Sequence, residues 1–413
     1  MASIEVDTRK AFLTIAKALD YVGIDDVHHS HRVAYMAFEC AKALQWSSAR
    51  QEQAFYTGLL HDCGVSSSRE HLRLLENMAP TDVNQHCVRG FEALQATELL
   101  KPFAVAVRYH HTPWHELKLL PMDEDDRDMA ALIHLADRVD FLRARYVDEG
   151  HPEIVTLYEG LIAENVLAKA GTLFNEQYAH TMADLVQTDG FWYAMEYDHI
   201  ESIGMGFSSY QPLNGLLNMA QLKELAIFLA NIVDAKSPFT FQHSEKVGLL
   251  AQQLAKDAGQ PETVCEGIYI SGLLHDVGKL RTPDEVLNHP GKLDERSQST
   301  MRRHAVDTLI TLDGLFPNSD IGRWAANHHE RLDGSGYPYR LKEQQLDVPS
   351  RIIALVDVFQ ALSQKRPYKG RLSLDEIFSI IEPMVLDGKL DKDLYGLLVN
   401  HGDRYYQLAI QTL

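Results

Sequence analysis

Apolar residues recur along most of this chain at intervals of three and four residues. In the stretch RIIALVDVFQALS, for example, Ile352, Ile353, Val356 and Phe359 fall on one side of a helix. Alternating patterns of the kind that indicate β-strands are scarce. The sequence therefore predicts an all-α fold.

The most apolar stretch, LLNMAQLKELAIFLANIVDA at residues 216–235, is interrupted by Lys223 and Glu224. This interruption favours an amphipathic helix over a membrane span. The N-terminal sequence MASIEVDTRK has acidic residues before any apolar run, so it does not resemble a secretory signal. We therefore expect a cytoplasmic protein without a membrane partner.

Five motifs occur twice in the same order, on either side of the Gly-, Ser- and Pro-containing segment at residues 203–215. The first copy runs HHSHRVA, GLLHDCG, QHCVRG, YHHTPW and LIHLADRVDFL, and the second runs QHSEKVG, GLLHDVGK, RHAVDT, NHHERLDGSGYP and IIALVDVFQAL. In both copies, 32 residues separate the histidine of the first motif from the His-Asp pair, His29 from His61 and His243 from His275. The repeat predicts two tandem helical domains of one kind, at residues 1–205 and 206–413.

Composition limits the partners of the chain. Its 413 residues, 45% hydrophobic and 23% charged, suit two globular domains. The net charge of -19 argues against a nucleic-acid duplex as partner, because phosphate backbones bind basic surfaces. The acidic chain can still bind a small anion if metal ions supply local positive charge. The four cysteines form no CxxC pair and are expected to be reduced thiols.

A set of histidines and aspartates in the second half carries the candidate chemistry. One His-Asp pair means little among 20 histidines, but seven such residues fall at element ends or on helical faces. An imidazole-rich set with two carboxylates and no thiolate suits Fe, Mn, Zn or Co. A carboxylate between two histidine groups can bridge two ions, which favours phosphate ester hydrolysis. The set is His243, His275, Asp276, His304, His328, His329 and Asp357.

The motifs GLLHDVGKL, RHAVDTL, NHHERLDGSGYP and RIIALVDVFQALSQKRPYKGRLS closely resemble the HD-GYP family, a branch of the HD superfamily of metal-dependent phosphohydrolases. The resemblance spans roughly residues 220–400 and is specific, because the signature HHExxDGxGYP is long. It implies an all-helical domain that hydrolyses a cyclic dinucleotide to the linear 5′-phosphorylated dinucleotide. Cyclic di-GMP is the main substrate of the family, and some members prefer 3′,3′-cyclic GMP-AMP.

The same resemblance implies roles for the individual residues. Two metal ions would share Asp276, and Lys279 would stabilise charge on the phosphate, so Asp276 and Lys279 are the expected catalytic residues. Iron or manganese is expected, and nickel, cobalt or zinc fits the same ligands. The ligands would be His243, His275, Asp276 and Asp357 for one ion and Asp276, His304, His328 and His329 for the other.

Substrate-binding residues are implied in the same way. Gly334 and Gly336 would let the loop of the signature turn beside the metals, and Tyr337, followed by Pro338, would project toward the substrate. Arg366 and Lys369 match family residues that grip the dinucleotide.

Two positions depart from the family pattern. Phe239 stands where trinuclear members carry a carboxylate, which argues against a third metal. Gln360 stands where members that bind cyclic di-GMP often carry aspartate. Because an amide both donates and accepts, Gln360 leaves room for an adenine, and we expect 3′,3′-cyclic GMP-AMP to be accepted at least as well as cyclic di-GMP.

The first half repeats the ligand set without two functional elements. Val65 stands where the second half has Lys279, and no Gly-rich tyrosine loop follows the histidine pair of YHHTPW. It resembles a degenerate HD domain, for which three interpretations stay open: a metal-binding regulatory domain, a second hydrolase, or a dimerisation module that would make the protein a homodimer. The candidate ligands are His29, His61, Asp62, His86, His110, His111 and Asp137.

The leading hypothesis is therefore a phosphodiesterase acting on a cyclic dinucleotide. A cyclic-dinucleotide receptor without turnover is the alternative from another class, and Lys279 together with the full ligand set argues against it. An HD phosphohydrolase acting on another nucleotide is the third alternative, and the GYP loop argues against that one.

Overall fold

The computed structural model describes residues 5–22, 28–68, 70, 78, 84–147, 151–237, 242–364 and 371–411. Throughout these residues the chain forms helices joined by turns, and its only β-type pairings are isolated bridges such as the one between Asp7 and Leu216. The predicted all-α fold is confirmed. None of the helices in these ranges has the length and apolar character that a membrane crossing requires.

The chain divides into two compact units, one comprising Asp7–Leu216 and the other Leu217–Leu413 together with Met1–Val6. The sequence places the boundary slightly earlier, between residues 205 and 206. The segment between these two points packs on the first unit. Phe207 is buried against Phe55, and the Glu52 carboxylate accepts the backbone N–H groups of three consecutive residues, Ser208, Ser209 and Tyr210.

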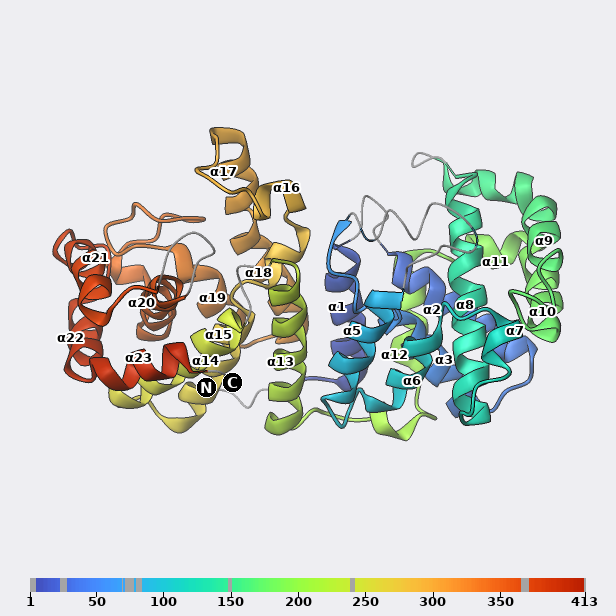
Figure 1. Ribbon diagram of the computed structural model, residues 1–413, viewed down its shortest axis with the longest axis horizontal. Helices are drawn as coiled ribbons and strands as arrows, with labels where there is room; N and C mark the ends of the chain where they lie inside the picture. Colours follow the sequence, from blue (N-terminus) through green and yellow to red (C-terminus); the bar gives the residue numbers. More distant parts are fainter. Residues whose placement is uncertain are drawn as a thin grey trace. The chain divides into compact units, whose positions relative to one another are not determined.

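The first unit is drawn in blue to green in Figure 1. Its centre is an aromatic core in which Phe12 meets Tyr56 and Phe103 edge to face, with ring centroids 5.5 and 5.7 Å apart. Its helices are α1 (Thr8–Asp20), α2 (His29–Ala43), α3 (Ser48–Leu60), α5 (Asn84–Gln95), α6 (Lys101–Tyr109), α7 (Trp114–Leu117), α8 (Glu124–Ala144), η1 (Pro152–Tyr158), α9 (Glu159–Leu167), α10 (Glu176–Val186), α11 (Asp189–Tyr193), α12 (Tyr197–Gly206) and η2 (Gln211–Leu213).

The second unit is drawn in yellow to red in Figure 1, and the residues of its apolar core lie between Val247 and Ala409. Its helices are α13 (Met219–Ala235), α14 (His243–Asp257), α15 (Glu262–Leu274), η3 (Val277–Arg281), α16 (Asp284–Leu287), α17 (Glu295–Arg302), α18 (His304–Leu315), α19 (Ile321–Ala326), η4 (Asn327–His329), η5 (Glu343–Gln345), α20 (Val348–Ser363), α21 (Leu374–Leu386), α22 (Lys392–Asn400) and α23 (Gly402–Ile410).

Equivalent glycines have equivalent surroundings in the two units. A Cβ on Gly64, which follows the first His-Asp pair, would lie 2.0 Å from the carbonyl oxygen of His86. A Cβ on Gly278, which follows the second pair, would lie 2.0 Å from the carbonyl oxygen of His304. Only glycine permits such an approach, so in each unit the turn after the His-Asp pair packs directly on the helix that carries the next histidine. The internal repeat of the sequence is therefore a repeat of structure.

Capping residues fix where the site-bearing helices of the second unit begin. The Asp234 carboxylate accepts hydrogen bonds from the backbone N–H and hydroxyl of Ser244, at 3.1 and 2.8 Å, which starts α14 at His243. The Asp347 carboxylate accepts the backbone N–H of Ser350 at the start of α20, the helix that carries Asp357. These caps fix the starts of α14 and α20, the helices that carry the candidate ligands His243 and Asp357.

Candidate metal centres

The seven predicted ligands of the second unit meet in one place. His243 begins α14, the His-Asp pair lies between α15 and η3, His304 begins α18, the histidine pair ends η4, and Asp357 lies in the third turn of α20. Ligands from five separate segments thus converge, which the repeat spacing alone does not require. Apart from His329, which is half-buried, all of them are buried: His243, His275, Asp276, His304, His328 and Asp357.

Asp276 lies between two groups of histidines. Its Oδ2 lies 3.3 Å from His275 Nε2, and its Oδ1 lies 3.6 Å from both His304 Nε2 and His328 Nε2. Asp357 completes the first group, with Oδ1 at 3.4 Å from His243 Nε2 and 3.7 Å from His275 Nε2. The two carboxylate oxygens of Asp276 therefore face different ligand groups, as a bridging carboxylate would.

Backbone carbonyls hold the imidazole rings in a common orientation. His275 Nδ1 donates to the carbonyl of Gly272 at 2.7 Å, and His328 Nδ1 donates to that of Ala325 at 2.7 Å. His304 Nδ1 donates to the carbonyl of Met301 in the same way. Because each Nδ1 carries the proton, each Nε2 presents a lone pair to the centre of the cluster.

The electrostatics of this cluster favour a bound cation. Burial acts to raise the pKa of Asp276, but the charges of His275 and Lys279 outweigh it and hold the pKa well below its usual range. Burial lowers the pKa of His304 to about 4 and that of His328 to about 3. Burial also acts to lower the pKa of His275, but the Asp276 and Asp357 carboxylates outweigh it and raise that pKa to about 9. Asp276 is therefore ionised beside neutral His304 and His328, and a bound metal ion would take the place of the proton on His275 Nε2.

Unsatisfied atoms give an independent test of whether metal fits. Asp276 Oδ1 and His275 Nε2 are buried without a hydrogen-bond partner within the described residues. Buried polar atoms are nearly always paired, so these two indicate a missing ligand. The nitrogen and oxygen donors, without sulfur, suit a first-row transition metal, and the ligands fall into the close groups His243–His275–Asp276 and His304–His328–His329. The residues therefore fit divalent metal ions.

Lys279 contacts the candidate metal centre directly. Its Nζ donates to Asp276 Oδ2 within η3, one turn after the His-Asp pair. The backbone around Lys279 is held by Lys236, a residue that sequence reasoning missed. The Lys236 side chain is 2% exposed, and its Nζ donates to the carbonyls of Lys279, Leu280 and Thr282. A lysine at the end of α13 gives no sequence signal for this role, because its three acceptors are more than forty positions away.

The GSGYP loop folds back onto the histidine pair. Glu330, which is 1% exposed, accepts the backbone N–H groups of Tyr339 and Leu341 at 2.7 and 2.9 Å. Gly334 has the left-handed φ of 81° that favours glycine. Gly336 is required for another reason, since a Cβ there would lie 2.4 Å from the backbone nitrogen of Arg331.

This fold places Tyr337 beside the candidate metal ligands. Its ring lies 4.7 Å from that of His329. The Arg302 guanidinium lies over the Tyr337 ring, 5.5 Å from its centroid. Arg302 was missed by the sequence analysis, because its place depends on a contact between α17 and a loop more than thirty positions later.

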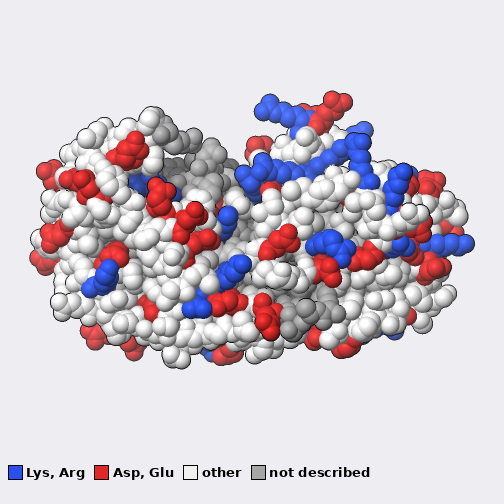
Figure 2. Space-filling model, turned by 180° about the vertical axis from the view of Figure 1, so that it is seen from behind, with Lys and Arg blue, Asp and Glu red and all other residues white. Residues whose placement is uncertain are grey.

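Basic residues gather near this point. Figure 2 shows Lys and Arg side chains on and beside the projecting α16–α17 segment of an otherwise acidic chain. The exposed members between α16 and α18 are Lys292, Arg296, Arg302 and Arg303. A basic surface of this kind favours the approach of anions.

The remaining predicted substrate residues have different outcomes. Gln360 lies on α20 one turn beyond Asp357, is fully buried, and has no hydrogen-bond partner for its amide nitrogen or oxygen within the described residues. Arg366, Lys369 and Phe239 lie outside the described residues.

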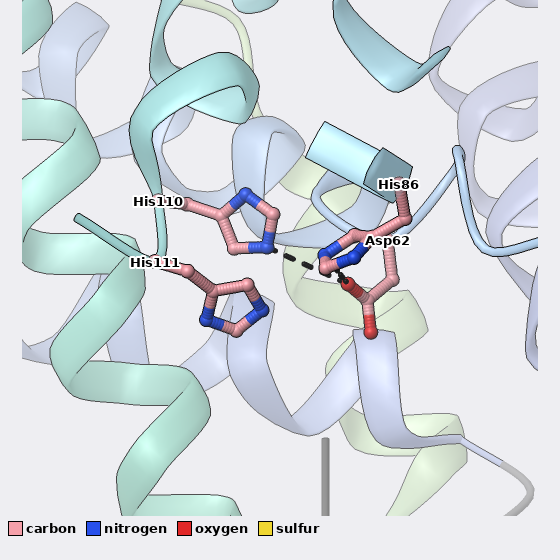
Figure 3. Close-up of side chains that lie close together, drawn as sticks. All are labelled: Asp62, His86, His110 and His111. Carbon is pink, nitrogen blue, oxygen red and sulfur yellow. Dashed lines mark ion pairs between the residues drawn. The ribbon is translucent and has the colours of Figure 1, made fainter. Parts of the chain in front are cut away.

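The seven candidate ligands of the first unit also meet. Asp62 Oδ1 lies 3.5 Å from both His86 Nε2 and His110 Nε2, and Figure 3 shows these side chains with His111 beside them. The others are close as well, since His29 Nε2 lies 3.6 Å from Asp137 Oδ1, and His29, His61 and Asp137 form a second group. The first unit therefore reproduces the ligand arrangement of the second.

The surroundings of this first cluster differ from those of the second. Val65 is buried where the second unit has Lys279, so no ammonium reaches Asp62 from that position. Arg138 is fully buried and donates to Asp137 Oδ2 at 2.8 Å, where the second unit has Val358. Asp140, at the place of Gln360, accepts from His29 Nδ1 at 2.8 Å and from two arginines, Arg32 and Arg143. The first unit therefore has the charged residues Arg138 and Asp140 at the positions where the second unit has the uncharged residues Val358 and Gln360.

Comparisons with known proteins agree with this architecture. An HD-domain family model matches residues 26–142, and another matches residues 228–394. A crystal structure of a cyclic GMP-AMP-specific phosphodiesterase from Vibrio cholerae has the same fold, with a TM-score of 0.65 and 21% identity over 97% of this chain and 98% of that one. Both halves of the chain are thus HD domains.

Curated relatives narrow the family. The chain is 45% identical to 3′3′-cGAMP-specific phosphodiesterase 1 of Vibrio cholerae, over 98% of this chain and 94% of the relative. It is 38% identical to a cyclic di-GMP phosphodiesterase of Thermotoga maritima, over 37% of this chain and 41% of that protein. The chain belongs to the HD-domain family of cyclic-dinucleotide phosphodiesterases.

Proposed function

We propose that this protein is a metal-dependent phosphodiesterase that opens 3′,3′-cyclic GMP-AMP, cyclic di-GMP or both to the linear 5′-phosphorylated dinucleotide. The observation that carries the proposal is the position of Asp276 between two groups of buried histidines. The relative that is 45% identical over nearly the whole chain is named for 3′3′-cGAMP, which supports the substrate class.

The residues of the second unit would hold two divalent ions, of which iron or manganese is our first expectation and nickel, cobalt or zinc the alternative. His243, His275 and Asp357 would bind one, the three remaining histidines the other, and Asp276 both. The chemistry that such ions supply is positive charge on the phosphate and a lowered pKa for the attacking water.

The side chains around the centre would orient the substrate and stabilise charge. In the hydrolysis a water oxygen attacks phosphorus, the P–O3′ bond breaks, and the 3′ oxygen leaves as a hydroxyl. Negative charge grows on the phosphate oxygens in this step, and Lys279 offers an ammonium beside Asp276 to stabilise it. Tyr337 lies beside the His329 ring, and the Arg302 guanidinium lies over the Tyr337 ring. These two side chains would contact the phosphate or a base of the substrate. Arg366 and Lys369 are proposed to grip the dinucleotide.

Gln360 is proposed to select the base. A fully buried amide without a hydrogen-bond partner among the described residues is costly unless a ligand pairs with it. An amide can pair with adenine or guanine, which favours a substrate that contains both.

The first unit is proposed to be regulatory. Its ligand cluster resembles that of the second unit, while Val65 replaces the catalytic lysine and the tyrosine loop is missing. Ligands without a group that stabilises the phosphate give little turnover.

Product chromatography tests the function directly. The purified chain would be loaded with Fe(II) or Mn(II) and incubated with 3′,3′-cyclic GMP-AMP, cyclic di-GMP or cyclic di-AMP. We expect a linear 5′-phosphorylated dinucleotide from the first two. Tight binding without any product under both metals would favour a receptor, and turnover of other nucleotides alone would favour a different phosphohydrolase.

A further inference from the structure

Three residues of the first unit form a cluster outside both HD centres. Asp20 is the last residue of α1, His28 is the N-cap of α2, and His31 lies in the first turn of α2. One ligand atom from each lies within 4.8 Å of those of the other two, the same closeness that the HD ligand groups satisfy. We call these three residues the Asp20 cluster. It shares no residue with the ligand sets described above.

The two histidines of the Asp20 cluster have nitrogen atoms without a partner. His31 is fully buried, with Nδ1 at 3.3 Å from Asp20 Oδ2, while its Nε2 has no hydrogen-bond partner within the described residues. His28 Nδ1 is likewise buried and without a hydrogen-bond partner in that part of the chain. Buried polar atoms are nearly always paired, so these two nitrogens indicate a partner that the described side chains do not supply.

The second unit shows that capping alone does not explain the histidines. Asp20 accepts the backbone N–H of Ser30 at 3.0 Å, just as Asp234 accepts that of Ser244 at 3.1 Å. Both aspartates thus start a helix in the same way. In the second unit Asp234 caps its helix although the positions of His28 and His31 are occupied by Gln242 and Glu245. This capping therefore does not require imidazoles. The imidazoles of the first unit therefore serve something besides the helix start.

We propose that the Asp20 cluster binds a zinc-like divalent transition-metal ion through Asp20, His28 and His31. Two imidazoles and one carboxylate form a common ligand set for such ions, with room for water at a further position. His28 and Tyr197 also line a cavity of about 450 Å³ in the first unit, so the cluster borders open space on its His28 side. The bound ion joins the end of α1 to the start of α2. This proposal does not depend on the hydrolytic function.

Metal counting in the full chain tests the site. The metal-free protein would be reconstituted with Zn²⁺, desalted and analysed by mass spectrometry of the metal. His28→Gln should hold one equivalent less per chain than the wild type. This change is mild for the fold, because His28 is half-buried and the second unit carries glutamine at the same left-handed position. The stabilisation of the thermal midpoint by Zn²⁺ should also be smaller in His28→Gln.

His180→Gln is the matched control, since His180 is exposed in the same unit and belongs to none of the clusters. It should keep the wild-type metal content. With Co²⁺ in place of Zn²⁺, the visible absorption of the wild type should lose one component in His28→Gln and none in His180→Gln. A His28→Gln variant with wild-type fold, metal content and cobalt spectrum would overturn the proposal.

Discussion

At the scale of single residues, the position of Asp276 does most to define the chemistry. Its two oxygens face separate histidine groups, so no neighbouring side chain can replace it for both. Lys279 lies beside Asp276 because the two residues are one turn apart at the start of η3. Both residues could be chosen from the motif HDVGK, because the pair and the lysine are close in sequence.

Asp276→Ala should abolish hydrolysis and lower the metal content of the second unit. Removal of a ligand shared by both groups weakens both, and we expect turnover to fall at least about a hundredfold. Metal analysis and product chromatography measure the two effects. Asp403→Ala, at an exposed position of the same unit, is the control. A variant with full metal content and normal turnover would show that Asp276 bridges nothing.

Lys279→Ala should separate metal binding from catalysis. Loss of one donor that stabilises transition-state charge commonly lowers the rate by about 10²–10³-fold, while the histidines and aspartates keep their metal. The measurements are kcat and metal content, compared with Lys392→Ala at an exposed position of the same unit. An unchanged kcat would mean that Lys279 does not act on the reacting phosphate.

Gln360→Asp should change base preference. Aspartate only accepts hydrogen bonds, and guanine offers two donors on its edge, whereas adenine offers both a donor and an acceptor. An unpaired buried polar group costs about 1–3 kcal/mol, which corresponds to roughly ten- to hundredfold discrimination. The ratio of kcat/KM for 3′,3′-cyclic GMP-AMP to that for cyclic di-GMP should fall by this factor. If the ratio stays constant, Gln360 does not contact a base.

At the scale of elements, the GSGYP loop shows what a motif can and cannot predict. The sequence indicates a turn beside the histidines, and Gly334 with its φ of 81° fits that expectation. It does not reveal that Gly336 serves a close approach, or that Glu330 holds the loop through two backbone N–H groups. Those contacts depend on how the loop folds back.

Gly336→Ala should therefore damage the loop and leave the metal ligands in place. The new methyl group would lie 2.4 Å from the Arg331 nitrogen, so the backbone must shift, at a cost of about 1–3 kcal/mol. We expect a raised KM or lowered kcat with unchanged metal content. Gly396→Ala is the control, because nothing lies within 4 Å of a Cβ there. Wild-type kinetics for Gly336→Ala would show that the loop position does not matter for the reaction.

Long-range contacts between elements also limited the site prediction. Lys236 supports the carbonyls around Lys279, and Arg302 stacks on Tyr337, yet neither belongs to a motif. The ligand histidines were predictable because their type, spacing and duplication are all visible in the sequence. Supporting residues of ordinary type are identified only when the folded chain places them next to the site.

At the scale of the whole molecule, one architecture occurs twice with different surroundings. The repeated glycines and carbonyl-anchored histidines show that both units fold by the same local rules. What differs is the charge next to the ligands, where buried arginines pair with the aspartates of the first unit. The order of the motifs predicted the duplication, while the end of the first unit depends on the packing of Phe207.

Asp62→Ala tests whether the catalytic step belongs to the second unit alone. In the first unit this change removes the carboxylate equivalent to Asp276, and neighbouring His86 and His110 lose a contact at 3.5 Å. Since Val65 leaves that cluster without a phosphate-stabilising ammonium, hydrolysis of 3′,3′-cyclic GMP-AMP should persist, with kcat within about threefold of the wild type if the catalytic step belongs to the second unit. The thermal midpoint and the metal content of the first unit should fall, because three or more buried histidines then lack their shared carboxylate. Circular dichroism measures folding in the same sample. Asp276→Ala in the same assay gives the turnover that is expected when the centre of the second unit is lost. Complete loss of turnover in well-folded Asp62→Ala would assign the catalytic step to the first unit or to both units acting together.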